Sequence, residues 1–402
     1  MRIAVWHNLP SGGGKRALHA HVKGLLERGH EIEVWCPSSA DGSYLPLGDM
    51  VREHARVIGP KREKPKLTLR EIVRNERADI EEMDRHCRDC AREIEAGRFD
   101  VLLAGSCHHF SVSSIARHVS LPSALYLQEP YRPLYEAMPG VVWWANRRRR
   151  PGLRRLVADY RLTQALRIQA RDEAENACAF DVILVNSLYS RESVLRAYGL
   201  DARVCYLGID VDVFRPTGVG REGYVLGLGA LMPHKNVGFV IDALARCEGK
   251  PPRLVWIANV AAPFYVNQLM AEARNRGVDF TPLIGISDAD LVAHLNTASV
   301  MVYAPRLEPF GLAPLEAAAC ELPTVAVAEA GVRESIEDGA TGVLVDNDPQ
   351  ALAAVVGGLL ADPARARAMG RQARENVEKF WTADLAAARL EEQLLALAGG
   401  TR

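Results

Sequence analysis

The chain alternates short apolar runs with stretches whose apolar residues recur at helical spacing. The first run, Ile3–Trp6, predicts a strand. Leu18, Val22 and Leu25 follow at i, i+4 and i+7, which predicts an amphipathic helix. A second strand is expected at Ile32–Cys36. A strand, a helix and a strand in this order are typical of a parallel α/β sheet.

The same alternation continues along the chain and repeats in its second half. The charge-rich residues 60–98 are expected to form a solvated helical excursion. The chain after Asp362-Pro363 is expected to be helical, with a break at Phe380-Trp381. Further strands are expected at residues 101–104, 124–127, 182–185, 204–207, 224–228, 254–258, 300–304, 324–327 and 343–345.

Proline and glycine concentrate in the segment Arg215–Gly220, which indicates a linker between two α/β halves. We therefore expect one domain over residues 1–215 and a second over residues 216–380. Two such domains imply a cleft, and ligands of parallel sheets bind beyond the carboxyl ends of the strands. The loops that follow strands are therefore the places to search for chemistry.

The composition, with 48% hydrophobic and 25% charged residues, is that of a globular protein. The net charge of −1 gives no bulk attraction to nucleic acid, although residues 1–215 hold 33 basic against 28 acidic side chains. No apolar run approaches the roughly 20 residues that span a bilayer. Because a strand stands where a secretion signal would, we expect a cytoplasmic location and free thiols at the eight cysteines.

Three consecutive glycines, Gly12, Gly13 and Gly14, separate the first strand from its helix. Lys15 follows them. Glycines let a backbone approach a ligand closely, and a helix start offers N–H donors to an anion. The dinucleotide-binding pattern is incomplete, because Cys36 stands where its acidic ribose ligand is expected. This loop is expected to bind an anion or a substrate, and a merely tight turn is the alternative.

A second loop runs from Glu308 and leads into a helix that starts near Gly311 or Leu312. Glu316 follows Leu312 by four residues, on the inward stripe of that helix. An inward carboxylate is costly unless it meets donors, which ligand hydroxyls such as those of a ribose would supply. The amides of Phe310, Gly311 and Leu312 would face an anion at the helix start. The alternative is a pair of unrelated acids, one of them in a structural ion pair.

A third loop, Gly229–Asn236, follows the first strand of the second half. Lys235 lies there near the start of a helix, where its ammonium group could stabilise a leaving phosphate. The alternative is an ordinary surface lysine.

The spacing of Glu308 and Glu316 resembles the E-x7-E motif of the retaining GT-B glycosyltransferases of family 4. Asn8–Lys15 resembles the family's N-terminal glycine loop, and Tyr206–Pro216 resembles its interdomain signature. Lys235-Asn236, Gly331–Glu334 and Asp338–Gly342 match its C-terminal domain in order. The resemblance is strong from about residue 181 onward, whereas residues 40–100 and 130–175 are not matched.

The resemblance implies a role for each of these residues. Lys235 corresponds to the diphosphate-binding lysine and Glu308 to the acid near the donor sugar, and both are expected to be catalytic. Glu316 corresponds to the acid that binds the donor ribose. Donor-binding residues are then expected to be Gly12, Gly13, Gly14, Lys15, Ile286, Phe310, Gly311, Leu312 and Glu316.

The implied fold is α/β, with two Rossmann-like domains and a final helix, residues 381–402, that crosses back to the first domain. The implied reaction moves a sugar from a nucleotide-diphosphate sugar, UDP or GDP foremost, to an acceptor with retention. No metal or other cofactor is expected, because protein cations would take the metal's place. The acceptor is a glycan, a lipid-linked intermediate or a small metabolite. It would lie near His109, Gln128, Glu129 and Arg132.

Two positions depart from the family pattern. Ala230 stands where the family often has an arginine, and Gln128 stands where a strand often leads to an active-site histidine. A front-face retaining mechanism can use the leaving phosphate as base, so turnover stays compatible with Gln128. A catalytically silent sugar-nucleotide-binding partner of another transferase, or a phosphorylase on the same scaffold, are the alternatives.

Three other motifs carry weaker signals. Cys87 and Cys90 form a single CxxC, which is too few ligands for a structural zinc site. Asp210-Val211-Asp212 is expected to be a structural turn. The tryptophans and arginines of Trp143–Arg155 suit contact with an anionic membrane surface, with a solvated basic helix as the alternative.

Overall fold

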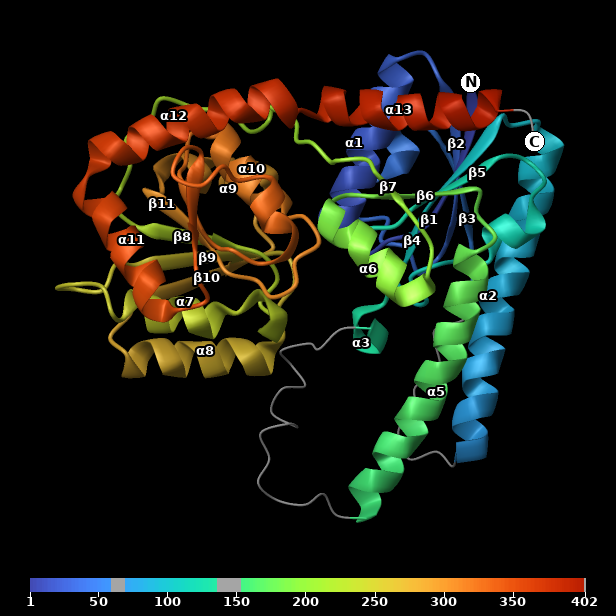
Figure 1. Cartoon of the computed structure of the whole chain (residues 1–402), viewed down its shortest axis with the longest axis horizontal. Coiled ribbons are helices and arrows are strands. Elements are labelled where there is room, and N and C mark those ends of the chain that lie inside the picture. The colour runs from blue at the N-terminus through green and yellow to red at the C-terminus, as the bar shows by residue number, and fades with distance from the viewer. Residues whose placement is uncertain (59–68, 136–152, 401–402) are drawn as a thin grey trace. The chain divides into compact units, whose positions relative to one another are not determined.

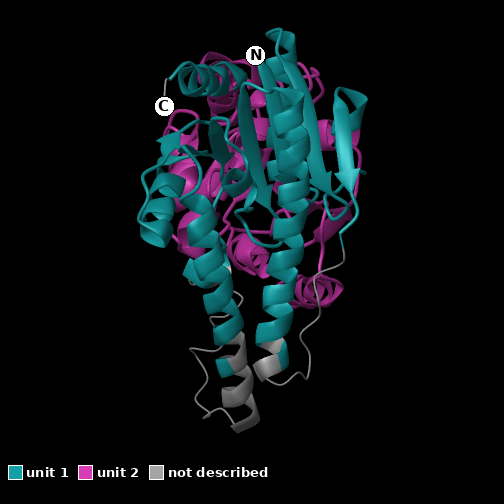
Figure 2. Cartoon of the chain, turned by 90° about the vertical axis from the view of Figure 1, so that its right-hand side faces the viewer, with its two compact units in different colours: residues 1–137, 141–206, 387–402 teal, residues 138–140, 207–386 magenta. Residues whose placement is uncertain are grey.

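Two parallel sheets form the framework, and each lies in its own compact unit of the chain (Figure 2). The computed structural model describes residues 1–58, 69–135 and 153–400. Within these limits, unit 1 comprises residues 1–137, 141–206 and 387–402, and unit 2 comprises residues 207–386. The chain passes from one unit to the other at residues 206/207 and again at 386/387. The sequence analysis expected these boundaries at 215/216 and 380/381.

Unit 1 contains a seven-stranded sheet in the order β3-β2-β1-β4-β5-β6-β7, with every pair parallel. Its strands are β1 (Arg2–Asn8), β2 (Glu31–Pro37), β3 (Arg52–Arg56), β4 (Val101–Cys107), β5 (Ser123–Tyr126), β6 (Val182–Val185) and β7 (Arg203–Val204). Its helices are α1 (Gly13–Glu27), α2 (Leu69–Gly97), α3 (Arg132–Tyr135), α5 (Leu153–Ala177) and α6 (Leu188–Tyr198). The direction of winding reverses between β1 and β4, which is where such sheets bind ligands.

The sequence suggested that the long helix α2 is solvated, but one of its faces is buried. Met83, Cys87 and Ile94 are buried in one apolar cluster with Trp6 and Trp35 of the sheet. The many charges between these positions hid a complete apolar stripe at helical spacing. In Figure 2, α2 and α5 run side by side as the two long helices of unit 1.

The chain's last helix, α13 (Ala383–Gly399), returns to unit 1, as the resemblance implied. It packs against α1 so closely that a Cβ on Gly24 would come 2.4 Å from that of Ala387. Glu391 of α13 accepts from His30 at 2.7 Å and pairs with Arg28 at 3.3 Å. The helix begins after the break at Phe380-Trp381, which was expected from the sequence.

Unit 2 contains a six-stranded parallel sheet in the order β10-β9-β8-β11-β12-β13. Its strands are β8 (Val225–Leu228), β9 (Leu254–Ala258), β10 (Phe280–Ile284), β11 (Val300–Tyr303), β12 (Thr324–Val327) and β13 (Gly342–Val345). Its helices are α7 (Val237–Leu244), α8 (Pro263–Asn275), α9 (Asp288–Thr297), α10 (Leu312–Ala319), α11 (Pro349–Ala361) and α12 (Pro363–Phe380) (Figure 1). Here the winding reverses between β8 and β11.

The sequence missed two strands, β3 and β10, and predicted β7 as longer than it is. Both missed strands lie at sheet edges, where one side of the strand has no partner and the apolar alternation weakens. β3 reads Arg-Glu-His-Ala-Arg, and β10 carries Pro282, a residue that sheets tolerate at their edges.

Candidate functional site

Lys235 and Glu308 form an ion pair at the point where the sheet of unit 2 reverses its winding. The distance between Lys235 Nζ and Glu308 Oε2 is 2.6 Å, and the two side chains are 16% and 14% exposed. Lys235 lies in the loop after β8 and Glu308 in the loop after β11, the two neighbouring strands at the reversal. A cation and an acid therefore meet where a parallel sheet of this type offers its ligand crevice.

Backbone geometry after β8 brings the lysine to this position. Gly229 has a φ of 144°, and a Cβ there would touch the Lys235 side chain at 3.4 Å. The Gly229 carbonyl accepts from Trp256 Nε1 at 2.8 Å, which fixes the turn against β9. Asn236, with a left-handed φ of 58°, then ends the short 3₁₀ turn Pro233–Lys235 and starts α7.

The loop that carries Glu308 is braced by the segment after β12. The Glu329 carboxylate accepts from the Leu307 N–H at 2.8 Å and pairs with Arg306 at the same distance. Gly331 donates its N–H to the Glu308 carbonyl at 3.0 Å. A Cβ on Gly331 would lie 1.9 Å from the Pro309 carbonyl oxygen, so this position admits glycine alone without a shift of the loop.

The predicted helix after this loop is present as α10, and its N-cap, Gly311, has a φ of 92°. Glu316 is 5% exposed, as its place on the inward stripe predicted. Leu312 is half-buried at the helix start, where its N–H and that of Gly311 lack partners within the helix. The Phe310 side chain points into the core, with its ring 5.6 Å from that of Trp381.

The loop after β10 completes this edge of unit 2. Gly285 has a φ of 70° and donates to the Ala258 carbonyl at 2.8 Å. Ile286 follows it and is half-buried, and Ser287 caps α9 by accepting from the Asp290 N–H. The residues of unit 2 singled out from the sequence are thus carried by the loops after β8, β10 and β11 and by α10, the helix that follows the last of these loops.

In unit 1 the glycine loop lies after β1, beside the reversal of that sheet. Gly12 caps α1 with a φ of 143°, and Gly13 is exposed in the first turn. A Cβ on Gly14 would contact the Gln128 side-chain amide at 3.3 Å. The Gln128 side chain is held in turn by Ser106, whose hydroxyl donates to its Oε1 at 2.9 Å. Gln128 therefore packs directly on the glycine loop.

The remaining acceptor-side residues of the sequence analysis lie in the same unit. Glu129 and Arg132 form an ion pair with each other. Tyr131 between them donates its backbone N–H to Glu173 Oε1 at 3.1 Å. His109 is half-buried, and its ring lies 5.1 Å from that of His108. No sequence pattern pointed to Glu173, because a single glutamate in a charged helix has no distinguishing neighbour.

Lys15 is 1% exposed, so its side chain points into unit 1 and not out of the glycine loop. Burial lowers the pKa of the lysine, and Glu53, Cys36 and Asp41 are the charged or titratable groups that oppose this effect. Burial also raises the pKa of the Cys36 thiol to about 12 and lowers the pKa of His7.

Among the other motifs, Asp210 accepts from the N–H groups of Asp212 and Val213, which is the structural turn that was expected. Cys90 Sγ lies 3.5 Å from His86 Nε2, but the described residues near this pair supply no third ligand for a metal. Side chains of Trp143–Arg155 lie outside the described residues. None of the described helices is long and apolar enough to cross a bilayer.

Two family models match this chain. A family model described as Glycosyltransferase Family 4 matches residues 11–213, and one described as Glycosyl transferases group 1 matches residues 213–376. A GDP-mannose-dependent alpha-(1-6)-phosphatidylinositol monomannoside mannosyltransferase of Mycolicibacterium smegmatis is 33% identical over 278 residues. That alignment covers 61% of this chain and 71% of the relative.

A D-inositol 3-phosphate glycosyltransferase of Paenarthrobacter aurescens is 26% identical over 97% of this chain and 94% of its own. Six other relatives align over 46–61% of their lengths. The structure of Anabaena HepE in complex with UDP and glucose superposes with a TM-score of 0.70 at 17% identity, over 98% of this chain and 100% of that one. The chain therefore belongs to glycosyltransferase family 4, the retaining GT-B enzymes that use nucleotide-sugar donors.

Proposed function

We propose that this chain transfers a hexose from a GDP-sugar to a hydroxyl group of an inositol-containing acceptor, with retention at the anomeric carbon. The proposed donor site rests on the Lys235–Glu308 ion pair, which lies where the sheet of unit 2 reverses its winding. The donor and acceptor classes are supported by the two relatives named above. The mannosyltransferase is named as GDP-mannose-dependent, and both names contain an inositol phosphate or an inositol lipid.

In the proposed reaction, each residue of unit 2 acts on a different part of the donor. Lys235 Nζ binds the diphosphate and stabilises the negative charge that grows as the bond to the anomeric carbon breaks. The N–H groups of Gly311 and Leu312 at the start of α10 act on the same charge. Glu308 contacts the sugar, and Glu316 accepts from the ribose hydroxyls. The backbone after Gly285, at Ile286, lies against the base.

The acceptor is assigned to unit 1, beside Gly13, His109 and the pair Glu129–Arg132. Its hydroxyl oxygen attacks the anomeric carbon while the hydroxyl proton passes to the departing phosphate oxygen. Gln128 has no basic group and is proposed to position the acceptor or the glycine loop on which it packs. No metal is proposed for this reaction, since Lys235 and the helix start supply positive charge.

The test is a transfer assay over a matrix of donors and acceptors. GDP-mannose, GDP-glucose, UDP-glucose and UDP-N-acetylglucosamine are each paired with inositol 3-phosphate and with phosphatidylinositol in detergent micelles. We expect product with a GDP-sugar, and nuclear magnetic resonance should show an α-linkage from an α-linked donor. A UDP-sugar preference would overturn the donor assignment. Nucleotide binding with no transfer to any acceptor would favour the silent partner, which Gln128 and Ala230 suggested.

A further inference from the structure

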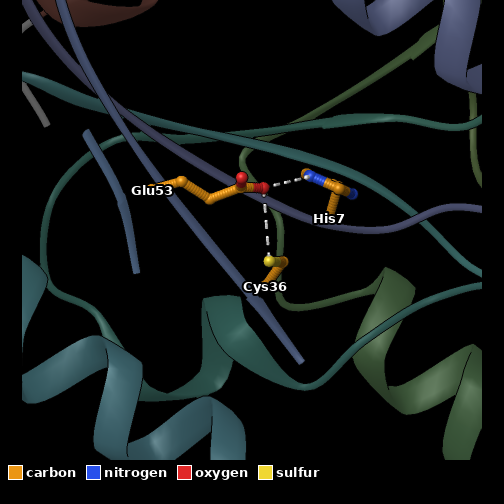
Figure 3. Close-up of side chains that lie close together, drawn as sticks. All are labelled: His7, Cys36 and Glu53. Atoms are coloured by element: carbon orange, nitrogen blue, oxygen red, sulfur yellow. Dashed lines mark hydrogen bonds and ion pairs between the residues drawn. The ribbon is translucent and has the colours of Figure 1, made fainter. Parts of the chain in front are cut away.

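Three side chains of metal-binding chemistry converge in unit 1, two from the carboxyl ends of β1 and β2 and one from the start of β3. They are His7, Cys36 and Glu53, and one potential ligand atom from each lies within 4.8 Å of the other two. Figure 3 shows the Glu53 carboxylate between the other two groups, with contacts to both. The sequence did not identify this cluster, because 29 and 17 residues separate successive members.

Strand register explains why these three side chains meet. Val5 of β1 pairs with Val34 of β2, which pairs in turn with Glu53 of β3. Side chains alternate along a strand, so His7 and Cys36, each two residues beyond its valine, lie on the same face as Glu53. The cluster is thus fixed by three neighbouring strands, which is a rigid support for ligands.

The two distances from the Glu53 carboxylate to the other groups suit a small tetrahedral ion. Zinc bonds of about 2.0–2.3 Å place neighbouring ligand atoms roughly 3.3–3.7 Å apart. Glu53 Oε1 lies 3.8 Å from His7 Nε2 and 3.4 Å from Cys36 Sγ. Nitrogen, sulfur and oxygen together are the ligand set of zinc, whereas magnesium and calcium prefer oxygen alone.

A second observation points to a ligand at this place. His7 is fully buried, and its Nε2 has no hydrogen-bond partner in the described part of the chain. Buried polar nitrogens without partners are rare, because the desolvation cost is not repaid. This nitrogen faces the carboxylate at a distance too long for a hydrogen bond and about right for two ligands of one ion.

Charge around the cluster allows a cation to bind. Lys15 is the competing positive group, and Glu53, Cys36 and Asp41 act on it electrostatically. A divalent ion bound by the Cys36 thiolate and the Glu53 carboxylate forms a neutral complex, one charge more positive than the metal-free thiol and carboxylate. Asp41 then remains as the acidic group that acts on Lys15. The Glu53 side chain is 20% exposed and provides the entry path from solvent.

We propose that His7, Cys36 and Glu53 form a binding site for one divalent cation of the zinc type, with water in the fourth position. Binding replaces the Cys36 S–H proton by an S–metal bond and releases that proton to solvent. The imidazole proton moves from Nε2 to Nδ1, which gives up the 3.4 Å contact from the Leu9 N–H. The site belongs to unit 1 and shares no residue with the proposed donor site, which is built from unit 2.

The test is a titration of the full-length, reduced, chelator-treated protein with Co²⁺ and Zn²⁺. We expect one Co²⁺ per chain, a thiolate-to-cobalt charge-transfer band in the near ultraviolet, the visible bands of tetrahedral cobalt, and displacement by one Zn²⁺. Cys36→Ser should abolish the charge-transfer band, and Glu53→Gln should weaken binding at least tenfold. Lys15→Met should tighten binding, because the competing ammonium is lost.

Two matched controls separate this site from other thiols. Cys90→Ser removes the thiol beside His86, and Cys178→Ser removes the exposed cysteine. Both should leave the cobalt spectrum unchanged. Loss of the band in either control, or no saturable cobalt binding by the unmodified protein, would overturn the proposal. If Cys36→Ser does not fold, alkylation decides: bound Zn²⁺ should protect Cys36 in the unmodified protein, and equal labelling with and without Zn²⁺ would refute the site.

Discussion

Lys235 Nζ and Glu308 Oε2 lie 2.6 Å apart although 73 residues separate them in the chain. The pair joins the loops after β8 and β11, whose strands are neighbours in the sheet of unit 2. Gly229 gives the lysine room on one side, and the segment Glu329–Gly331 braces the glutamate loop on the other. The ammonium group is therefore held in place before any diphosphate binds, which is the preorganisation that electrostatic catalysis needs.

Lys235→Ala should lower turnover by about two orders of magnitude or more, since the charge opposite the leaving diphosphate is lost. Steady-state kinetics with the best donor measures this effect. Lys250→Ala, an exposed lysine of the same unit, is the matched control and should keep full activity. Unchanged kinetics in Lys235→Ala would remove the lysine from the mechanism.

Glu316→Gln should weaken nucleotide binding about 10- to 100-fold, because hydrogen bonds to a buried carboxylate are stronger than those to an amide. Calorimetry with GDP and with 2′-deoxy- and 3′-deoxy-GDP measures the loss. If Glu316 binds the ribose, the loss of binding free energy on its substitution and the loss on removal of the contacted hydroxyl should not be additive. Additive losses with both analogues would place its contact elsewhere. Glu248→Gln, at an exposed position, serves as the control.

Gly331→Ala should impair donor binding and stability together. Its Cβ would meet the Pro309 carbonyl oxygen at 1.9 Å, so the loop that carries Glu308 must move. Gly358→Ala is the matched control, because this helical glycine has open space around it and should gain up to about 1 kcal/mol in stability. Thermal unfolding measures the stability of both variants, and nucleotide titration measures their affinity for GDP. A Gly331→Ala protein with unaltered GDP affinity would show that loop position does not control binding.

Glu173→Gln should make unfolding less dependent on pH. Burial raises the pKa of Glu173 from 4.5 to about 7, so the folded protein binds a proton that the unfolded chain releases. The resulting stabilisation is complete below pH 4.5 and is lost as the pH rises to about 7. The change in the free energy of unfolding that the substitution causes should therefore be more favourable at pH 8 than at pH 5, by up to about 3 kcal/mol.

Denaturant unfolding at the two pH values measures this difference. The amide oxygen of glutamine can still accept from the Tyr131 N–H and the Tyr198 hydroxyl, so the local contacts are retained. Glu175→Gln, on the exposed face of the same helix, should show no pH-dependent gain. Equal slopes against pH in Glu173→Gln and the parent protein would contradict the raised pKa.

The sequence predicted most of the fold where a local pattern was strong. Central strands such as β1 and β9 are continuous apolar runs, because both faces of a doubly wound sheet are buried. The helix α10 and the burial of Glu316 followed from spacing alone. The edge strands β3 and β10 did not, since an edge strand needs less apolar surface and its partner is set by the tertiary fold.

The sequence was less informative about side chains whose partners are distant in the chain. Lys15 was expected to face a ligand, but its side chain is buried, and Glu53 acts on its charge. Glu53 lies on β3, a strand that the apolar pattern did not reveal. The support that Glu329 and Gly331 give to the Glu308 loop likewise depends on the order of β11 and β12 in the sheet. Such relationships come from strand register, which no local period encodes.

The carboxyl edge of unit 2 is proposed to bind a nucleoside diphosphate without a divalent metal. The most direct measurement is thermal unfolding of the full chain with GDP, UDP and ADP, each with and without EDTA, because a ligand of the native state raises the melting temperature. We expect GDP to raise the melting temperature by an amount that EDTA does not alter and that Lys235→Ala reduces. No shift with any nucleotide, or a shift that EDTA abolishes, would contradict this proposal.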